Sequence, residues 1–338
     1  MSDKPQFEVS EQGKLLGETP NGPAVAPHVA ASGGGVVGWA KRVWRYLSVM
    51  YPVGERILVA VLLFFEIYFI SLLNHGVRQF SVGVQELVGA FTVFSFLMWL
   101  RVADDFKDYE LDCRLFADRP LPAGEVSKRD LIILMLIMIP GTLLLNLLLM
   151  PNFWFCLFLY TYGSLMAVWF FQKHKIQPSL PLALFTHNPV QIILNIYVLS
   201  FTIIKYHLPA FDWMNFLAVF TLYFPALIWE VTRKIRAPQD ETNYTTYSKL
   251  FGYKKATTFA EIVTWMDILT NFALVWNINR WSVLVLLGLV LWMTWQFEDF
   301  KRDPTRYKIV DKVLRYTFLQ EFTMIATVVL AILFPGLK

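Results

Sequence analysis

Four aspartates within nine residues carry the strongest chemical signal in this sequence: Asp104, Asp105, Asp108 and Asp112. On a helix each residue advances about 100°, so Asp104, Asp108 and Asp112 would fall within roughly 80° of one another. Carboxylates this close repel unless protons or cations lie between them. Mg²⁺ prefers oxygen ligands and commonly bridges one or two carboxylates to substrate phosphates. The spacing therefore predicts that Asp104, Asp108 and Asp112 hold Mg²⁺ against a diphosphate, with a solvated acidic helix end as the alternative.

Two further segments fit the same chemistry. The segment from Glu230 to Asp240 mixes acids with the cations Lys234 and Arg236. Carboxylates for a metal and cations for phosphate oxygens belong together in a diphosphate site, although an ion-paired membrane anchor is the alternative. Arg119 lies in the turn sequence Arg-Pro-Leu-Pro-Ala-Gly, where it could contact a diphosphate or hold the acidic segment in place.

Several polar residues lie inside apolar stretches of the sequence. His187 and Asn188 are predicted to line a substrate pocket, because polar groups at membrane depth usually face a cavity or a neighbouring helix. Hydrogen bonding between helices is the alternative for this pair. No spacing links Glu66, Asp267 and Glu321, so we interpret each of them as packing against a partner elsewhere.

The elements that must position these residues are membrane helices. Of the 338 residues, 56% are hydrophobic and only 17% are charged, against about 25% charged residues in soluble domains. A bilayer core needs roughly 20 apolar residues of helix. Nine stretches approach that length: 56–74, 86–103, 130–150, 153–171, 181–204, 213–233, 256–276, 281–298 and 313–335. The predicted fold is an all-α integral membrane bundle of nine transmembrane helices, with a central cavity that opens to the cytoplasmic side.

The distribution of cations predicts the orientation of this bundle. Of the 30 Lys and Arg residues, all but Arg78, Lys205, Arg280 and Lys338 fall on the side that holds the N-terminus. Cations are enriched on the cytoplasmic side of membrane proteins, so the N-terminus and both acidic segments are predicted to be cytoplasmic, at the inner membrane if the source is bacterial. Residues 1–40 are predicted to be a disordered tail without a signal peptide, and 41–338 the membrane domain.

These motifs resemble those of the UbiA superfamily of intramembrane prenyltransferases. Asp104-Asp105-x-x-Asp108-x-x-x-Asp112 is similar to the family motif Asn-Asp-x-x-Asp-x-x-x-Asp, with Asp104 in place of Asn. The run from Arg119 to Gly124 resembles the Arg-Pro-Leu-Pro-Ser-Gly element that follows it. Weaker similarities involve Tyr51 to Gly54, Lys175, and Thr246 with Gly252, and the whole resemblance covers roughly residues 45–335.

The resemblance implies a Mg²⁺-dependent enzyme that transfers a prenyl group from a prenyl diphosphate to an aromatic or lipid acceptor. It implies that one Mg²⁺ is bound by Asp104, Asp108 and Asp112, and a second by Glu230 and Asp240. Contacts with the diphosphate are expected from Arg119, Lys175, Lys234 and Arg236. The acceptor is expected near His187 and Asn188, the lipid bilayer is an expected partner, and no nucleic acid is expected to bind.

The second motif departs from the family pattern. The family has Asp-x-x-x-Asp where this chain has Glu230-x-x-x-Lys234. Either Glu230 and Asp240 share the metal, or Lys234 replaces one metal ligand by a direct phosphate contact. Two other functions therefore stay open. One is a UbiA-type terpene cyclase, which acts on a prenyl diphosphate without an acceptor. The other is a cation transporter, which would distribute acidic residues across the depth of the bilayer rather than at one face.

Overall fold

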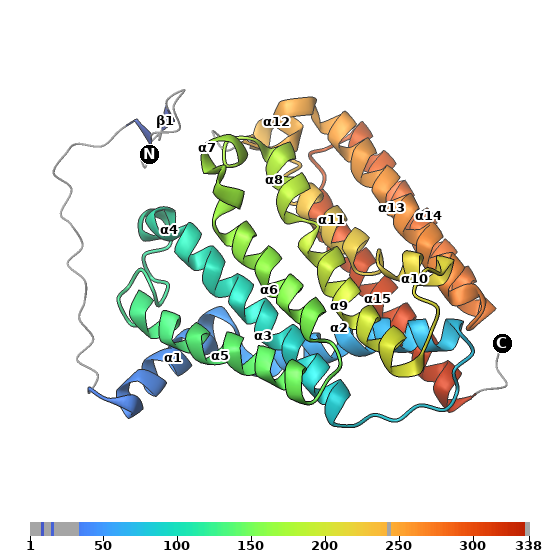
Figure 1. The fold of residues 1–338 in the computed structure, drawn as a ribbon. Helices are drawn as coiled ribbons and strands as arrows, with labels where there is room; N and C mark the ends of the chain where they lie inside the picture. The colour runs from blue at the N-terminus through green and yellow to red at the C-terminus, as the bar shows by residue number, and fades with distance from the viewer. Residues whose placement is uncertain (1–7, 10–14, 17–33, 242–244, 335–338) are drawn as a thin grey trace.

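A computed structural model describes residues 8–9, 15–16, 34–241 and 245–334 of the chain (Figure 1). Two strands of two residues each, β1 (Glu8–Val9) and β2 (Leu15–Leu16), pair in antiparallel fashion. Every other regular element in the described ranges is helical. The predicted disordered tail lies largely outside the described residues, but α1 (Val36–Met50) already begins before residue 40.

Eight helical segments of the described chain are long and apolar enough to cross a membrane. They are α2 (Val53–Asn74), α3 (Val84–Lys107), α5 (Lys128–Leu148), α8 (Leu180–His187) with α9 (Val190–Tyr206), α10 (Trp213–Ala218) with α11 (Tyr223–Thr232), α13 (Tyr253–Trp276), α14 (Arg280–Arg302) and α15 (Ile309–Leu333). The shorter helices are α1, α4 (Tyr109–Leu115), α6 (Phe153–Ala167), α7 (Lys173–Ile176) and α12 (Tyr247–Phe251), with the 3₁₀ turns η1 (Trp169–Phe171) and η2 (Pro238–Asp240).

The predicted count of nine full spans is not confirmed, because α6 is shorter than the stretch 153–171. Its 15 residues extend about 22 Å at 1.5 Å per residue, less than a hydrocarbon core of about 30 Å. The next residues explain the early end. Trp169, Phe170 and Phe171 have φ angles of 54°, 49° and 58°, a left-handed conformation that a right-handed helix cannot continue through.

Two of the spanning segments are interrupted within the bundle. The break between α8 and α9 falls at Asn188-Pro189, where proline lacks the N–H that would continue the helical hydrogen bonds. Between α10 and α11 the backbone of Leu222 is left-handed, with φ of 63°. The Asn195 side chain from α9 fills this second break by donating to the carbonyl of Val219 at 2.8 Å and to that of Thr221. Such breaks are tolerated in membranes where side chains satisfy the freed backbone groups.

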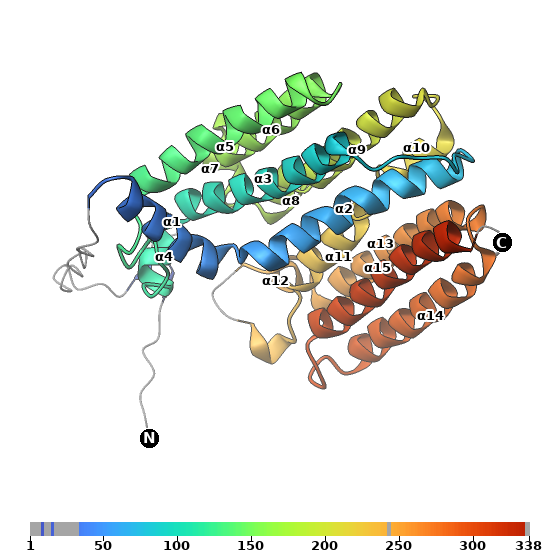
Figure 2. The ribbon, with the colours of Figure 1, turned by 90° about the horizontal axis from the view of Figure 1, so that it is seen from below.

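Helix α2 runs through the middle of the bundle (Figure 2). It packs against α3 and α9 on one side and against α13 and α15 on the other. The short helices α4, α7 and α12 lie at one end of the bundle, and α10 lies toward the other end (Figure 1). The topology therefore brings both acidic segments, which begin in the last turns of α3 and α11, to the same end.

Candidate functional site

The acidic segment is helical, as its spacing suggested, but it bends at Asp108. Helix α3 ends at Lys107 and α4 begins at Tyr109, with Asp108 between them at φ −100° and ψ 9°. Backbone hydrogen bonds of the helical type still join Asp108 to Asp104 at 2.9 Å and Asp112 to Asp108 at 2.8 Å. The predicted spacing is thus kept across the bend, but Asp104 and Asp108 are exposed whereas Asp112 is buried.

Asp112 is held by a cation from the turn that follows. The Arg119 Nη1 atom donates to Asp112 Oδ2 at 2.8 Å. The Arg119 guanidinium also lies over the Phe116 ring, 4.0 Å from its centroid. The sequence left two roles open for Arg119: holding the acidic segment in place or contacting a diphosphate. The ion pair with Asp112 corresponds to the first role, and the second stays a prediction.

Asp105 is occupied by partners inside the protein. Its side chain forms an ion pair with Arg101, one turn earlier on α3. It also accepts a hydrogen bond of 2.5 Å from the Tyr46 hydroxyl of α1. Burial, together with the neighbouring Asp105 charge, raises the pKa of Tyr46 well above its usual value, so the phenol remains a donor. Asp105 therefore links α1 to α3 through its hydrogen bond with Tyr46.

Lys107 lies between the acidic segment and the aromatic residues of η1. Its ammonium lies 3.6 Å from the Asp104 carboxylate and 4.4 Å from the centroid of the Trp169 ring. The Trp169 ring in turn lies 5.1 Å from the ring of His187, centroid to centroid. Lys107 is not among the residues predicted from the sequence, where its one signal is its place within the aspartate motif.

The charges around Asp108 come from more than one element. Desolvation raises the pKa of Asp108, Lys107 opposes this effect, and the charge of Asp112 adds to it. Arg101 and Lys173, the latter on α7, also favour the ionised form. An additional cation beside Asp108 would act in the same direction, since opposite charge stabilises a carboxylate.

Polar atoms without partners gather around His187 and Asn188. The Nδ1 atom of His187 lies 2.9 Å from the Thr186 hydroxyl. Within the described ranges, Nε2 of His187, the side-chain nitrogen of Asn188 and Nε1 of Trp169 are buried and have no hydrogen-bond partner. Buried polar groups are usually paired, so three orphans on neighbouring elements indicate room for a polar group from outside the protein.

In the second acidic segment, Glu230 forms ion pairs with neighbouring residues of the same segment. Both carboxylate oxygens of Glu230 are occupied, by Arg233 at 2.5 and 2.9 Å and by Lys234 at 2.8 Å. Asp240 is exposed in η2, and no hydrogen bond or ion pair joins it to Glu230 among the residues that the structure describes. The backbone N–H of Arg236 donates to the Ser248 hydroxyl at 2.9 Å.

The remaining predicted diphosphate contact, Lys175, lies on α7 and is exposed. The structure therefore brings Asp104, Asp108, His187 and Asn188 around Lys107 and Trp169. It leaves Glu230 in ion pairs with its own helix.

The fit to Mg²⁺ depends on the first segment. In the described part of the chain, no group of three or more His, Cys, Asp or Glu side chains is arranged to hold a metal ion. Mg²⁺ often uses only one or two carboxylates and completes its shell with water and phosphate oxygens. Asp104 and Asp108 are the exposed carboxylates of the first segment, so a metal held there would take most of its ligands from water and substrate.

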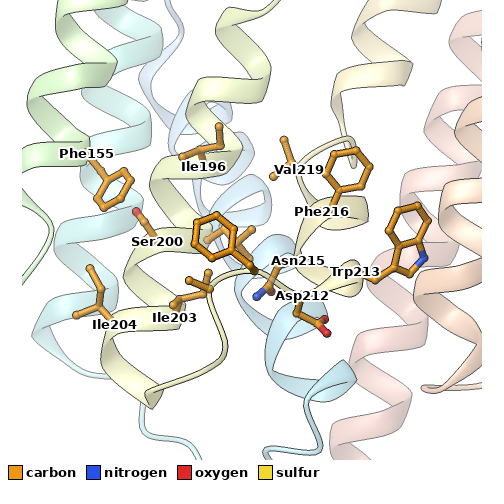
Figure 3. Close-up of a pocket in the computed structure, with 13 residues that line it drawn as sticks. Phe155, Ile196, Ser200, Ile203, Ile204, Asp212, Trp213, Asn215, Phe216 and Val219 are labelled. Atoms are coloured by element: carbon orange, nitrogen blue, oxygen red, sulfur yellow. The ribbon is translucent and has the colours of Figure 1, made fainter.

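The predicted cavity at the cytoplasmic end is not confirmed. A cavity of about 750 Å³ lies instead toward the other end, between α6, α9 and α10 (Figure 3). Its wall is almost entirely apolar and includes Phe155, Ile196, Ile203 and Phe216. None of the predicted site residues lines this cavity.

The comparisons with known proteins address the fold. No protein-family model and no curated protein sequence matches this chain. A solved structure of digeranylgeranylglyceryl phosphate synthase, a UbiA-family prenyltransferase, is similar with a TM-score of 0.64 and 15% sequence identity. The similarity covers 86% of this chain and 99% of that one. The chain thus has the same fold as that synthase, and this similarity of fold agrees with the resemblance seen in the motifs.

Proposed function

We propose that this protein is a membrane prenyltransferase, which uses Mg²⁺ to transfer a prenyl group from a prenyl diphosphate to a hydrophobic or aromatic acceptor. One observation carries the proposal: Lys107 lies between the Asp104 carboxylate and the Trp169–His187 pair. Carboxylates for a metal, a cation for phosphate and a pair of aromatic rings are thus within reach of one another. The similarity of fold to digeranylgeranylglyceryl phosphate synthase also supports a prenyltransferase function.

The leaving group is proposed to bind at the bend between α3 and α4. Asp104 and Asp108 would hold the metal, while Arg119 keeps Asp112 oriented beside them. Bound Mg²⁺ supplies positive charge to the phosphate oxygens as negative charge develops on the diphosphate. Lys107 adds a fixed ammonium, which stabilises that charge without having to reorganise.

The cations of the second segment are proposed to contact the diphosphate directly. Lys234 and Arg236 follow α11 at the same end of the bundle, and Lys175 is presented by α7. Arg233 and Lys234 already occupy both oxygens of Glu230, so Glu230 is not free to bind a metal. Of the two alternatives for the altered motif, this favours a phosphate contact by Lys234. A second metal on Glu230 and Asp240 would require these ion pairs to open.

The acceptor end is proposed to lie at the break between α8 and α9. Breaking the allylic C–O bond leaves positive charge on the prenyl group, which the rings of Trp169 and Phe170 can stabilise through their π faces. The unpaired Nε2 of His187 and the amide of Asn188 would orient the polar group of the acceptor. The surrounding apolar side chains keep water away from the cation, which water would otherwise capture.

The test uses the purified full-length protein with prenyl diphosphates from geranyl to geranylgeranyl. Each donor is incubated with and without Mg²⁺, and with and without a panel of aromatic and lipid-alcohol acceptors. The proposal predicts diphosphate release and a prenylated acceptor, both dependent on Mg²⁺. A cyclic hydrocarbon formed without any acceptor would instead assign a terpene cyclase, and the absence of diphosphate release from every donor would contradict both enzymes.

A further inference from the structure

Three carboxyl side chains meet inside the bundle, on helices other than those that carry the acidic segments. Glu66 comes from α2, Asp267 from α13 and Glu321 from α15. Glu66 and Asp267 are 4% and 1% exposed, and Oε2 of Glu321 is buried. Glu66 interacts directly with Glu321, and Asp267 interacts electrostatically with both. The sequence predicted that Glu66, Asp267 and Glu321 would each pack against a different residue. In the structure the three acids interact with one another.

Neutral polar side chains complete this cluster. Gln320 and Tyr316 of α15 are both fully buried. Gln320 lies beside Asp267, and Tyr316 is close enough to Asp267 and Glu321 to interact with both electrostatically. Neither amide atom of Gln320 nor the Tyr316 hydroxyl has a hydrogen-bond partner within the described ranges. Because these groups are buried beside the acids and unpaired, we infer that a further hydrogen-bonding atom belongs to the cluster.

The missing component must supply hydrogen-bond donors. One oxygen of each acid has no partner: Glu66 Oε1, Asp267 Oδ2 and Glu321 Oε2. The Asn271 amide donates to the other oxygen of Asp267 at 3.0 Å. An ionised carboxylate only accepts hydrogen bonds, so adjacent carboxylates cannot satisfy one another. A proton on one of them creates a donor and removes a charge in the same step.

Within the described ranges, no basic side chain is seen to compensate the cluster. The titratable groups that act on the three acids there are the acids themselves, and Asp267 and Glu321 in turn act on Tyr316. Nor do the acids form a group arranged to hold a metal ion. Uncompensated charge at membrane depth is strongly unfavourable, and contacts between like charges add to that cost.

We propose that Glu66, Asp267 and Glu321, with Gln320, Asn271 and Tyr316, form an intramembrane proton-binding site. At neutral pH a proton bound to a carboxylate oxygen gives a carboxylic acid, whose O–H donates to an acceptor that is otherwise unpaired. The hydrogen bonds formed in this way join α2 to α13 and α15. Because the folded state then holds more protons than the unfolded state, its stability falls as the pH rises above neutral.

The direct test is infrared spectroscopy of the full-length protein in lipid, which detects the C=O band of protonated carboxyl groups. At neutral pH the wild type is expected to show this band, shifted by exchange into D₂O. Glu321→Gln and Asp267→Asn are expected to reduce it, because each removes one acid at nearly constant shape. Glu110→Gln is the matched control, since Glu110 is an exposed acid on α4, outside the membrane-spanning helices.

A second measurement uses stability. The melting temperature of the wild type is expected to fall between neutral and alkaline pH, whereas that of the Glu66→Gln/Glu321→Gln double variant should fall less. A wild type without the band, stabilised by NaCl but not by choline chloride, would overturn the proposal in favour of a metal cation. Equal bands in the wild type and both single variants would also overturn it.

Discussion

At the scale of single residues, the four aspartates divide into two kinds. Asp105 and Asp112 are buried and held by Arg101, Tyr46 and Arg119. Asp104 and Asp108 remain exposed at the bend. Spacing could predict that the aspartates lie close together, because neighbours four residues apart share a helix face. It could not separate the two kinds, because Tyr46 and Arg119 approach from other parts of the chain.

Loss of Arg119 should destabilise the protein. Arg119→Met leaves the buried Asp112 carboxylate without its charged donor, so we expect a loss of about 1–3 kcal/mol in the free energy of unfolding. Arg114→Met is the control, because Arg114 is exposed on α4 and no ion pair of it is seen in the described chain. Chemical denaturation in detergent measures both variants, and equal stabilities would contradict the positioning role.

At the scale of elements, the left-handed turn η1 determines where the Trp169 ring lies in the candidate site. It ends α6 early and places Trp169 against Lys107 and His187. Left-handed backbone costs roughly 1–2 kcal/mol per residue with a side chain. Trp169, Phe170 and Phe171 carry no local signal for this conformation, which is why the sequence predicted that the span would continue to 171. Tertiary packing against α8 stabilises the turn.

A glycine in η1 should relieve part of this strain. Phe171 is 76% exposed, so Phe171→Gly loses little buried surface and is expected to raise stability by about 1 kcal/mol. Phe185 is similarly exposed but lies within α8, where glycine is expected to lower stability by roughly 0.5–1 kcal/mol. Thermal unfolding compares the two variants with the wild type. The strain account fails if Phe171→Gly is destabilising to the same extent as Phe185→Gly.

At the scale of the whole molecule, composition and motif spacing predicted the membrane bundle and its fold. Apolar stretches are readily visible in sequence because every helix that crosses a bilayer needs them. The meeting of Glu66, Asp267 and Glu321 was not predictable, since α2, α13 and α15 are distant in the chain and are joined only by packing. The approach of Lys107 to Trp169 depends likewise on tertiary structure.

The two native cysteines provide a test of the predicted orientation. Cys113, on α4 beside the acidic segment, is exposed, whereas Cys156 on α6 is buried. A membrane-impermeant maleimide should label the protein in inverted vesicles and leave it unlabelled in sealed right-side-out cells or spheroplasts. Cys113→Ser is the control and should abolish labelling. Labelling from the external side would place the acidic segment outside the cytoplasm and reverse the orientation.

The exposed carboxylates at the bend are proposed to act in diphosphate chemistry. The decisive experiment measures the Mg²⁺-dependent rate of diphosphate release by the wild type, Asp108→Asn and Glu110→Gln. Losing one group that stabilises developing charge commonly costs about 10²–10³-fold in rate, so we expect Asp108→Asn to lose activity by that factor. Glu110→Gln, on the adjacent turn of α4, should keep the wild-type rate. Full Mg²⁺-dependent turnover by Asp108→Asn would contradict the account.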